Sequence, residues 1–220
     1  MSDIKLIIGN KNYSSWSLRA WFFLKQFNIP FEEVRLPLRT KRFQQEIKKY
    51  SPIAKVPTLN HGEIQIWDSL AICDYVSEFL LNGKGWPVDQ KSKAHARSIS
   101  AEMHSGFFGI RNQLPMNCKA IKKNYTLDND TWSEIKRIQQ IWSHCQESNP
   151  EGPWLFGEFS VADAMYIPIV SRFQTYEIPL ELNTQKYLNF VCENDFFKEW
   201  LEASKNEEEI IEDSEIGKNT

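Results

Sequence analysis

The stretch KVPTLNHGEIQIWDSLAICDYV, residues 55–76, says more about the fold than any other part of this 220-residue chain. Two short apolar segments flank His61 and Gly62, a pattern typical of two strands joined by a tight turn. Asp68 and Ser69 come next, and such residues often begin a helix. The apolar positions that follow make one broad face, so the stretch predicts a β-hairpin that leads directly into a helix.

Toward the amino terminus the pattern alternates between strand and helix. KLIIGN, residues 5–10, is typical of a buried strand that ends in a turn, and WSLRAWFFLKQF, residues 16–27, is apolar on most sides of a helix. FEEVRLPL, residues 31–38, has an imperfect strand pattern, and KRFQQEIKKY, residues 41–50, is a polar helix. The order β-α-β-α-β-β-α predicts a thioredoxin-like domain with a mixed four-stranded sheet and helices on its faces.

Toward the carboxyl terminus the signal is helical nearly throughout, and no strand pattern is convincing. LNGKGWPVDQ, residues 81–90, has the glycine and proline content of an interdomain link. We therefore expect a thioredoxin-like domain at 1–82, a linker at 83–90 and an all-helical domain at 91–206. Residues 207–220 are acidic and poor in apolar side chains, which predicts a frayed tail.

Composition excludes several classes of function. A net charge of -3 disfavours binding to nucleic acid. The four cysteines form no C-x-x-C pair and no spacing of metal ligands, which predicts free thiols and no metal. No apolar run has the length of a membrane span, so we expect a cytoplasmic protein with no membrane partner.

Several motifs together resemble the cytosolic glutathione transferases. KVPTL (55–59), WDSLAICDYV (67–76) and FSVADAMYIP (159–168) occur in the order and at the separations typical of that family. SSWSLR (14–19) resembles the S-S-C-S-x-R signature of the zeta class, the maleylacetoacetate isomerases, with Trp16 in place of cysteine. The resemblance implies glutathione as co-substrate, an electrophile bound by the helical domain, and a homodimer.

The serine cluster has two interpretations. Serine often caps a helix, and the family pattern instead implies a hydroxyl that stabilises the glutathione thiolate. An unperturbed thiol has a pKa of about 8.5, so a hydrogen-bond donor and a positive helix end are needed to keep it ionised near neutrality. The resemblance favours Ser14 as the donor, with Ser15 as the alternative, and we expect Ser17 within the first turn.

Further glutathione contacts are implied by the same resemblance. A cis Val56–Pro57 bond would expose the Val56 backbone to the cysteinyl part of the peptide, and Lys55 would reach the glycyl carboxylate. Asp68 and Ser69 would hold the γ-glutamyl end, although this pair can also be only a cap. In the last motif, Ser160 and Asp163 resemble a capping box, to which we assign a structural role. The expected glutathione contacts are Ser15, Lys55, Val56, Asp68 and Ser69.

The acceptor pocket is less clear from sequence. AEMHSGFFGIRNQLPMN, residues 101–117, carries side chains suited to a cleft, and an arginine could bind a substrate carboxylate. A helical core stripe with structurally paired arginines explains the same pattern. The candidates are Arg19, Met103, Phe107, Phe108, Arg111 and Met116.

Three functions compete. The first is a glutathione transferase whose thiolate adds to an electrophile, by conjugation or cis-trans isomerisation, between which the sequence does not decide. The second is a non-catalytic binding protein of the same fold, which would use the surface around Trp132 and Trp142 or the acidic tail. The third, a dithiol oxidoreductase, is disfavoured because Trp16 stands where a redox cysteine would lie.

Overall fold

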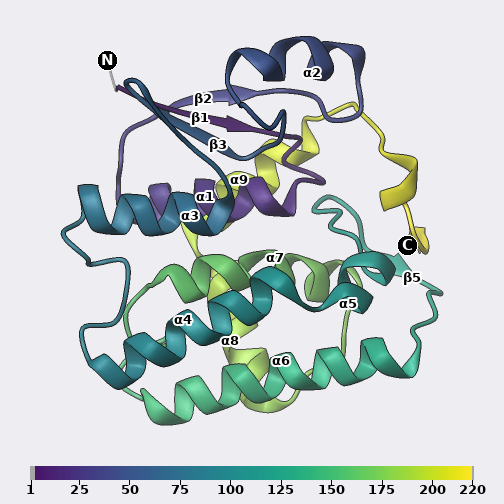
Figure 1. The fold of residues 1–220 in the computed structure, drawn as a ribbon. Coiled ribbons are helices and arrows are strands. Elements are labelled where there is room, and N and C mark those ends of the chain that lie inside the picture. Colours follow the sequence, from purple (N-terminus) through teal and green to yellow (C-terminus); the bar gives the residue numbers. More distant parts are fainter. Residues whose placement is uncertain (1–2, 220) are drawn as a thin grey trace.

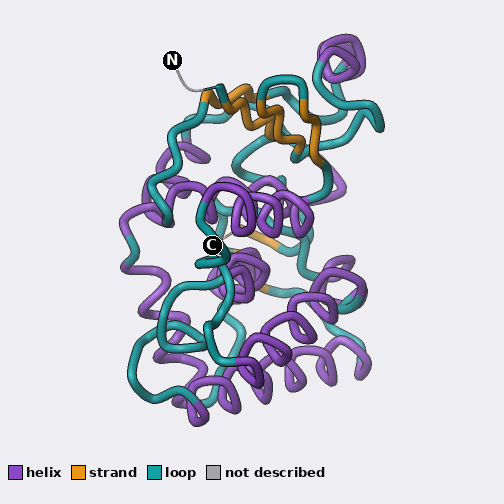
Figure 2. Tube along the Cα trace, turned by 60° about the vertical axis from the view of Figure 1, so that its left-hand side comes forward, coloured by secondary structure: helices purple, strands orange, loops and turns teal. Residues whose placement is uncertain are grey.

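A four-stranded mixed sheet lies at one end of the molecule and stacked helices form the rest, as the computed structural model shows (Figure 2). The structure describes residues 3–219, so the first two residues of the predicted first domain and the last residue of the predicted tail lie outside it. The predicted fold class, a thioredoxin-like domain followed by a helical domain, is confirmed. The boundaries of the two domains stay a prediction.

The sheet has the strand order β2-β1-β3-β4. β1 pairs in parallel with β2 and antiparallel with β3, and β3 pairs antiparallel with β4. β1 is central and apolar because its side chains are covered on both faces, whereas β4 at the edge is exposed. The strands are β1 (Ile4–Ile8), β2 (Glu32–Arg35), β3 (Thr58–His61) and β4 (Ile64–Ile66).

Helices cover both faces of this sheet (Figure 1). α2 (Lys41–Glu46) and the following 3₁₀ turn η1 (Ile47–Lys49) cover one face, where Ile7 packs on Ile47 in a small apolar cluster. α1 (Ser15–Gln26) and α3 (Ser69–Tyr75), which continues as a π-helical turn η2 (Val76–Leu80), cover the other face. α1 is buried nearly all round because it lies between the sheet and the helical part.

The helical part is built around α7, which is buried over almost its whole length and packs against α1 and α4. The predicted capping box at its start is present, and Asp163 also accepts hydrogen bonds from Leu155 N at 2.9 Å and Tyr187 Oη at 3.0 Å. The helices are α4 (Gln90–Ser105), α5 (Phe108–Gln113), α6 (Asn129–Ser148), α7 (Val161–Thr175), α8 (Leu182–Glu193) and α9 (Asp195–Lys205).

The carboxyl-terminal segment differs from the frayed tail that we predicted. After α9 it runs along the side of the molecule, through the 3₁₀ turn η3 (Glu212–Ser214), to β6 (Lys218–Asn219), which pairs with β5 (Lys122–Lys123) (Figure 1). Composition alone suggested fraying because the segment has few apolar residues. Its carboxylates instead have partners elsewhere in the chain, and Ile211 is buried.

The prediction that Trp142 lies on the surface is wrong. Trp142 is fully buried and its ring packs on Tyr187 at 4.8 Å between centroids, whereas Trp132 is partly exposed. The surface proposed for a non-catalytic binding protein therefore has no Trp142. Among residues 3–219, no helix combines the length and apolarity needed to cross a membrane.

Candidate functional site

Ser14 lies at the start of α1, and its hydroxyl does not cap the helix. It occupies the N-cap position, yet its side chain accepts no hydrogen bond from a backbone N–H of the first helical turn. Its Oγ lies 2.7 Å from Ser17 Oγ, and Ser17 Oγ accepts a hydrogen bond from Gly9 N at 3.0 Å. Because Gly9 N–H already donates to Ser17, the Ser17 hydroxyl can donate to Ser14 and leave the Ser14 proton for a ligand.

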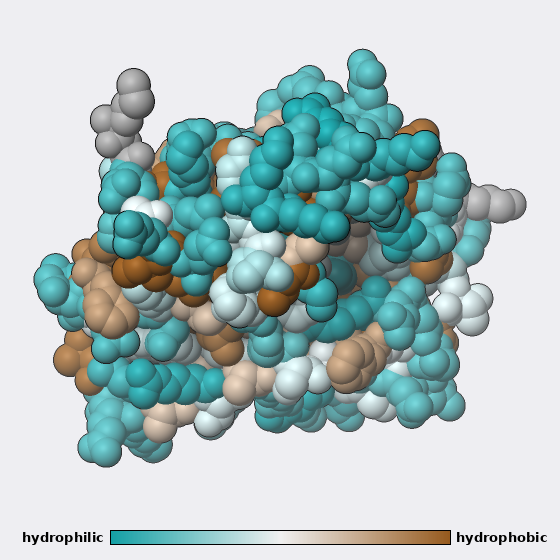
Figure 3. Space-filling view, turned by 45° about the horizontal axis from the view of Figure 1, so that its top comes forward, coloured by the Kyte–Doolittle hydropathy of each residue, from teal (hydrophilic) through white to brown (hydrophobic). Residues whose placement is uncertain are grey.

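Two adjoining cavities open beside this serine. The first, of about 430 Å³, is lined by Ser14 and Ser15 on one side and by residues of the helical part on the other. The second, of about 340 Å³, extends toward Asp68. Both are lined by Trp16, Lys55 and Val56, so together they form one groove between the sheet end and the helical part. Figure 3 shows this region as a hollow with a mostly hydrophilic rim.

The wall opposite the serines is a backbone segment that precedes β3. The Val56–Pro57 bond is cis, as the resemblance implied. Val56 backbone groups form no hydrogen bond with any other residue that the structure describes, and Val56 lines both cavities. An extended peptide can pair with such a free backbone edge. Lys55 is exposed at the same rim.

Asp68 lines the far end of the groove, whereas Ser69, the first residue of α3, is buried and lines neither cavity. Asp68 Oδ1 accepts from Leu70 N at 3.1 Å, so this carboxylate does cap α3, and its Oδ2 lies 2.9 Å from His104 Nε2. The Ser69 hydroxyl is fully buried without a hydrogen-bond partner among residues 3–219.

Trp16 separates the two cavities. The guanidinium carbons of Arg19 and Arg111 lie 4.5 and 4.8 Å from the centre of its ring, and the ring of His104 meets it edge-on at 5.3 Å. Cations over an indole face are attracted by its quadrupole. These contacts hold the Trp16 ring where the zeta-class signature has a cysteine, and the ring lines both cavities between the serines and Asp68.

Only two of the six acceptor-pocket candidates line the first cavity, namely Arg111 and Met116. Arg19 is 1% exposed behind Trp16 and donates to Met165 O at 3.0 Å, so it cannot meet a substrate directly. Met103 and Phe107 are buried in the core, and Phe108 points into solvent at 64% exposure. The helix is interrupted between α4, which ends at Ser105, and α5, which begins at Phe108. The side chains around this interruption therefore do not line the first cavity.

Three arginines bring positive charge close to this groove. Burial, helped by repulsion from Arg111 and Arg172, lowers the pKa of Arg19, and burial with repulsion from Arg111 lowers the pKa of Arg172 to about 10. None of the three forms an ion pair with a carboxylate in the part of the chain that the structure describes. Arg111 and Arg172 line the first cavity. A buried cation without a counter-ion favours an anionic ligand.

Sequence reasoning missed several of these groups. Arg172 and Tyr13 line the first cavity, and His104 lines the second. An arginine within the apolar stretch IPIVSRF was a usable signal, because a charged residue in a buried helix usually has a function. Ser214 also lines the first cavity, and nothing in the local sequence of the tail indicated this.

Comparison with known proteins gives a family match at the sheet end of the chain. Residues 13–78 match the family described as Glutathione S-transferase, N-terminal domain. A probable maleylacetoacetate isomerase of Caenorhabditis elegans is 34% identical over 112 residues, which cover 51% of this chain and 52% of that protein. The rat maleylacetoacetate isomerase is 27% identical over 181 residues, 76% of each chain. The matched region thus spans about half the length of the nematode relative.

Solved structures extend the likeness to the whole fold. A glutathione transferase homologue from Burkholderia, with bound glutathione, superimposes with a TM-score of 0.69 at 19% identity, covering 93% of this chain and 99% of that one. A tau-class glutathione S-transferase from mango has a TM-score of 0.68 at 19% identity, covering 92% and 96%. At this level of identity the likeness establishes the architecture only.

Proposed function

We propose that this chain, whose residues 13–78 match the glutathione S-transferase N-terminal domain family and which resembles the zeta class, activates glutathione through Ser14 and adds the thiolate to an electrophile. The observation that carries this proposal is the Ser14 hydroxyl, which lines the groove and is not used to cap α1. Ser15, the first residue of α1, lines the same cavity and is the alternative donor.

Glutathione fits the groove by the chemistry of its lining. The cysteinyl backbone would pair with the free backbone groups of Val56, and the γ-glutamyl end would lie beside Asp68 at the start of α3, where Ser69 is the predicted further contact. Asp68, already close to His104, has a half-exposed carboxylate for the ammonium group. Lys55 supplies a cation at the rim for the glycyl carboxylate. This arrangement directs the sulfur toward the start of α1.

At that point the thiol loses its proton to solvent, and the sulfur anion is stabilised by two features. Ser14 donates a hydrogen bond, and the unpaired N–H groups of the first turn of α1 contribute positive dipole. The thiolate then forms a carbon–sulfur bond with one carbon of an electron-poor double bond, whose π electrons move onto the neighbouring conjugated group. In conjugation this anionic adduct takes a proton from solvent and leaves. In isomerisation the adduct rotates about the former double bond, the electrons return, and the carbon–sulfur bond breaks to release the thiolate.

The electrophile that suits the first cavity carries a carboxylate. Arg111 and Arg172 face the cavity without carboxylate partners among residues 3–219, whereas Met116 and Pro115 supply apolar surface. An anionic group on the substrate would relieve the mutual repulsion of the buried Arg172 and the half-buried Arg111. A relative named maleylacetoacetate isomerase fits this class, because the compound in that name is acidic. Trp16 limits the size of the electrophile beside the sulfur.

Titration of bound glutathione tests the proposal. The intact protein is saturated with glutathione and thiolate absorbance is followed against pH, with S-methylglutathione as the blank. We expect a bound thiol pKa about two units below the free value of about 8.5. Retention on glutathione-agarose is the companion measurement. A folded protein that neither binds glutathione nor acidifies its thiol would reject the proposal.

We also propose the homodimer that the family resemblance implied. Ile64, Trp67 and Phe79 are exposed apolar side chains on or beside β4 and at the end of η2, where a second copy would bury them. Light scattering of the intact protein tests this, because a solution mass of 25.8 kDa, that of one chain, would reject it.

A further inference from the structure

The loop that precedes Ser14 is held by residues from the far end of the chain. Lys11 O accepts a hydrogen bond from Trp200 Nε1 at 2.8 Å, and Asn12 O accepts one from Cys118 N at 3.1 Å. Lys11 N and Asn12 N both donate to Glu207, at 2.7 and 3.0 Å. Every backbone N–H and C=O of these two residues thus has a partner more than a hundred residues away.

Glu207 is the centre of this arrangement. Its side chain is 5% exposed, and its two oxygens are divided between the two neighbouring amides, Oε1 toward Lys11 and Oε2 toward Asn12. Arg35 lies 3.3 Å from Oε1 and balances the charge. Two adjacent N–H groups that donate to one carboxylate form a pair of charge-assisted hydrogen bonds with a specific geometry. Glu207, the first residue of the acidic tail, is therefore fixed in place by these contacts.

The backbone carries this constraint directly to Ser14. Asn12 precedes it by two positions, and Ser14 N donates to Asn10 O at 2.8 Å, which closes the loop as a turn. Asn12 itself is fully buried, and its Oδ1 accepts from Lys119 N at 3.0 Å. A displacement of residues 11 and 12 would consequently move the N-cap position and the hydroxyl on it.

We propose that Glu207 is a positioning residue for Ser14, fixing the loop of residues 10–13 so that the hydroxyl meets the glutathione sulfur. This inference rests on the proposed function. Its physical basis is that the strength of a hydrogen bond falls steeply with distance and angle, so the thiol pKa depends on the place of the hydroxyl. Glu207 lines neither cavity of the groove, so it would act on the thiol through the backbone of Lys11 and Asn12.

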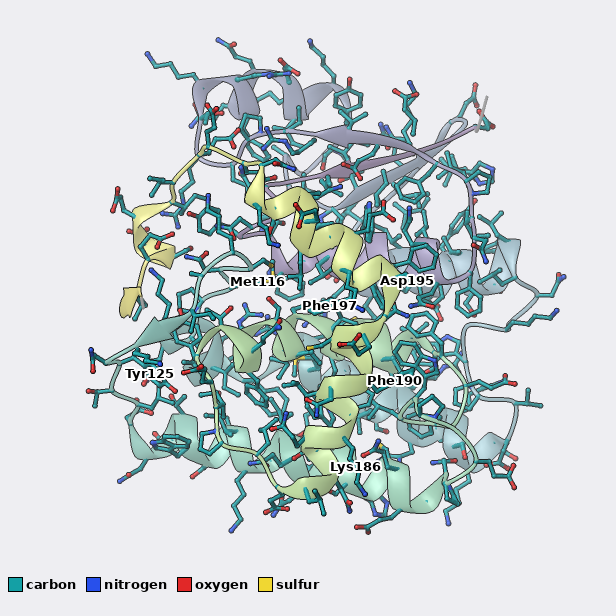
Figure 4. All side chains as sticks on the ribbon, turned by 180° about the vertical axis from the view of Figure 1, so that it is seen from behind. Met116, Tyr125, Lys186, Phe190, Asp195 and Phe197 are labelled. Atoms are coloured by element: carbon teal, nitrogen blue, oxygen red, sulfur yellow. The ribbon has the colours of Figure 1, made fainter. Side chains whose placement is uncertain are left out.

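A second carboxylate of the same tail supports this role. Glu215 accepts a hydrogen bond from Tyr13 Oη at 2.7 Å and forms an ion pair with Lys122 at 2.6 Å. Tyr13 stands between Asn12 and Ser14 and lines the first cavity, as does Ser214. Figure 4 shows the tail descending past the side of the molecule that carries Met116 and Tyr125, with α9 beside it. The tail thus contacts the serine loop at two separate places.

The test replaces Glu207 with Gln in the full chain. Glutamine keeps one acceptor oxygen but sets an NH₂ group against one of the two backbone N–H donors, so the loop must shift. We expect the bound thiol pKa to rise by about one unit and kcat at pH 6.5 to fall about tenfold, with recovery above the new pKa. Affinity for S-methylglutathione, which lacks the thiol, should stay unchanged.

Glu209→Gln is the matched control. Glu209 also pairs with Arg35, at 3.0 Å, but has no hydrogen bond to the loop of residues 10–13. The control removes the same charge beside the same arginine, and its thiol pKa should equal that of the wild type. Equal pKa shifts in the two variants, or none in Glu207→Gln, would overturn the proposal.

A further variant covers the case in which Glu207→Gln does not fold. Glu207→Asp keeps the charge and both oxygens but draws them back by one carbon–carbon bond, and a smaller upward shift of the thiol pKa is expected. An unshifted pKa in folded Glu207→Asp overturns the inference. If the wild-type protein does not lower the pKa of the glutathione thiol, the proposed function itself is rejected. If the wild type lowers this pKa and both Glu207 variants lower it equally, only the role of Glu207 is rejected.

Discussion

Replacing Ser14 with alanine separates a thiolate donor from a helix cap. The Ser14 side chain makes no capping hydrogen bond, and its partner Ser17 keeps the hydrogen bond from Gly9 N after the substitution. The usual loss for removing a serine cap, about 0.5–2 kcal/mol, should therefore not appear. For a chain of this size a loss of about 1 kcal/mol would lower Tm by about 2–4 °C, so we expect a smaller change than that.

The thiol should respond much more strongly than the fold. A hydrogen bond to a charged acceptor contributes about 1.5–3 kcal/mol, and one pKa unit corresponds to about 1.4 kcal/mol. Loss of the Ser14 hydroxyl should consequently raise the pKa of bound glutathione by about 1–2 units. The helix end remains, so the pKa should stay below that of free glutathione.

The assay is thiolate absorbance against pH, with thermal unfolding followed on the same samples. Ser15→Ala is the matched control, because Ser15 lines the same cavity one residue later and should leave the pKa unchanged. A thiol pKa unaffected in Ser14→Ala but raised in Ser15→Ala would transfer the role to Ser15. A thiol pKa unaffected in both variants would exclude both serine hydroxyls as donors to the thiolate.

Three other substitutions test separate parts of the structure. Burial raises the pKa of Asp163 to about 6, so ionisation of this group lowers stability as pH rises from about 4 to about 6. Asp163→Asn should remove that slope. Its NH₂ group also opposes one of two donor pairs, either Leu155 N with Tyr187 Oη or the N–H and hydroxyl of Ser160, which should lower Tm by about 6–12 °C in a calorimeter at pH 7. A Tm within error of the wild type would contradict this. Arg111→Met should raise KM for a carboxylate-bearing electrophile about 10–100-fold in steady-state kinetics and leave KM for glutathione and for a neutral electrophile nearly unchanged; equal losses for both electrophiles would argue against a carboxylate partner. Trp16→Cys places a thiol in the groove, so incubation with oxidised glutathione should give a mixed disulfide by mass spectrometry, with wild type as control; a Trp16→Cys variant that stays unmodified would show that the sulfur of glutathione lies elsewhere.

Local sequence patterns predicted the sheet end of the fold because its signals are short-range. The alternation around His61 and Gly62 and the Asp68–Ser69 start of α3 each depend on residues a few positions apart, and the structure has the hairpin and the helix there. The start of α1 was equally readable. The Ser14, Ser15 and Val56 positions converge on one groove, as the family resemblance implied, although their roles stay predictions.

The rest depended on contacts that no local pattern records. Arg19 was expected as a polar helix position available to substrate, but it is buried because Trp16 covers it and Met165 O accepts its hydrogen bond. The tail was expected to fray because composition does not reveal that Glu207 meets Lys11 and Asn12 across almost two hundred residues. Long-range partners of charged side chains are set by topology, so only the folded structure shows them.

A crystal structure with glutathione bound tests the central claim most directly, by the distance between the glutathione sulfur and Ser14 Oγ. We expect these two atoms to lie within hydrogen-bond distance, with the cysteinyl backbone paired to Val56. A sulfur directed away from both Ser14 and Ser15, or a groove that stays empty at millimolar glutathione, would contradict it.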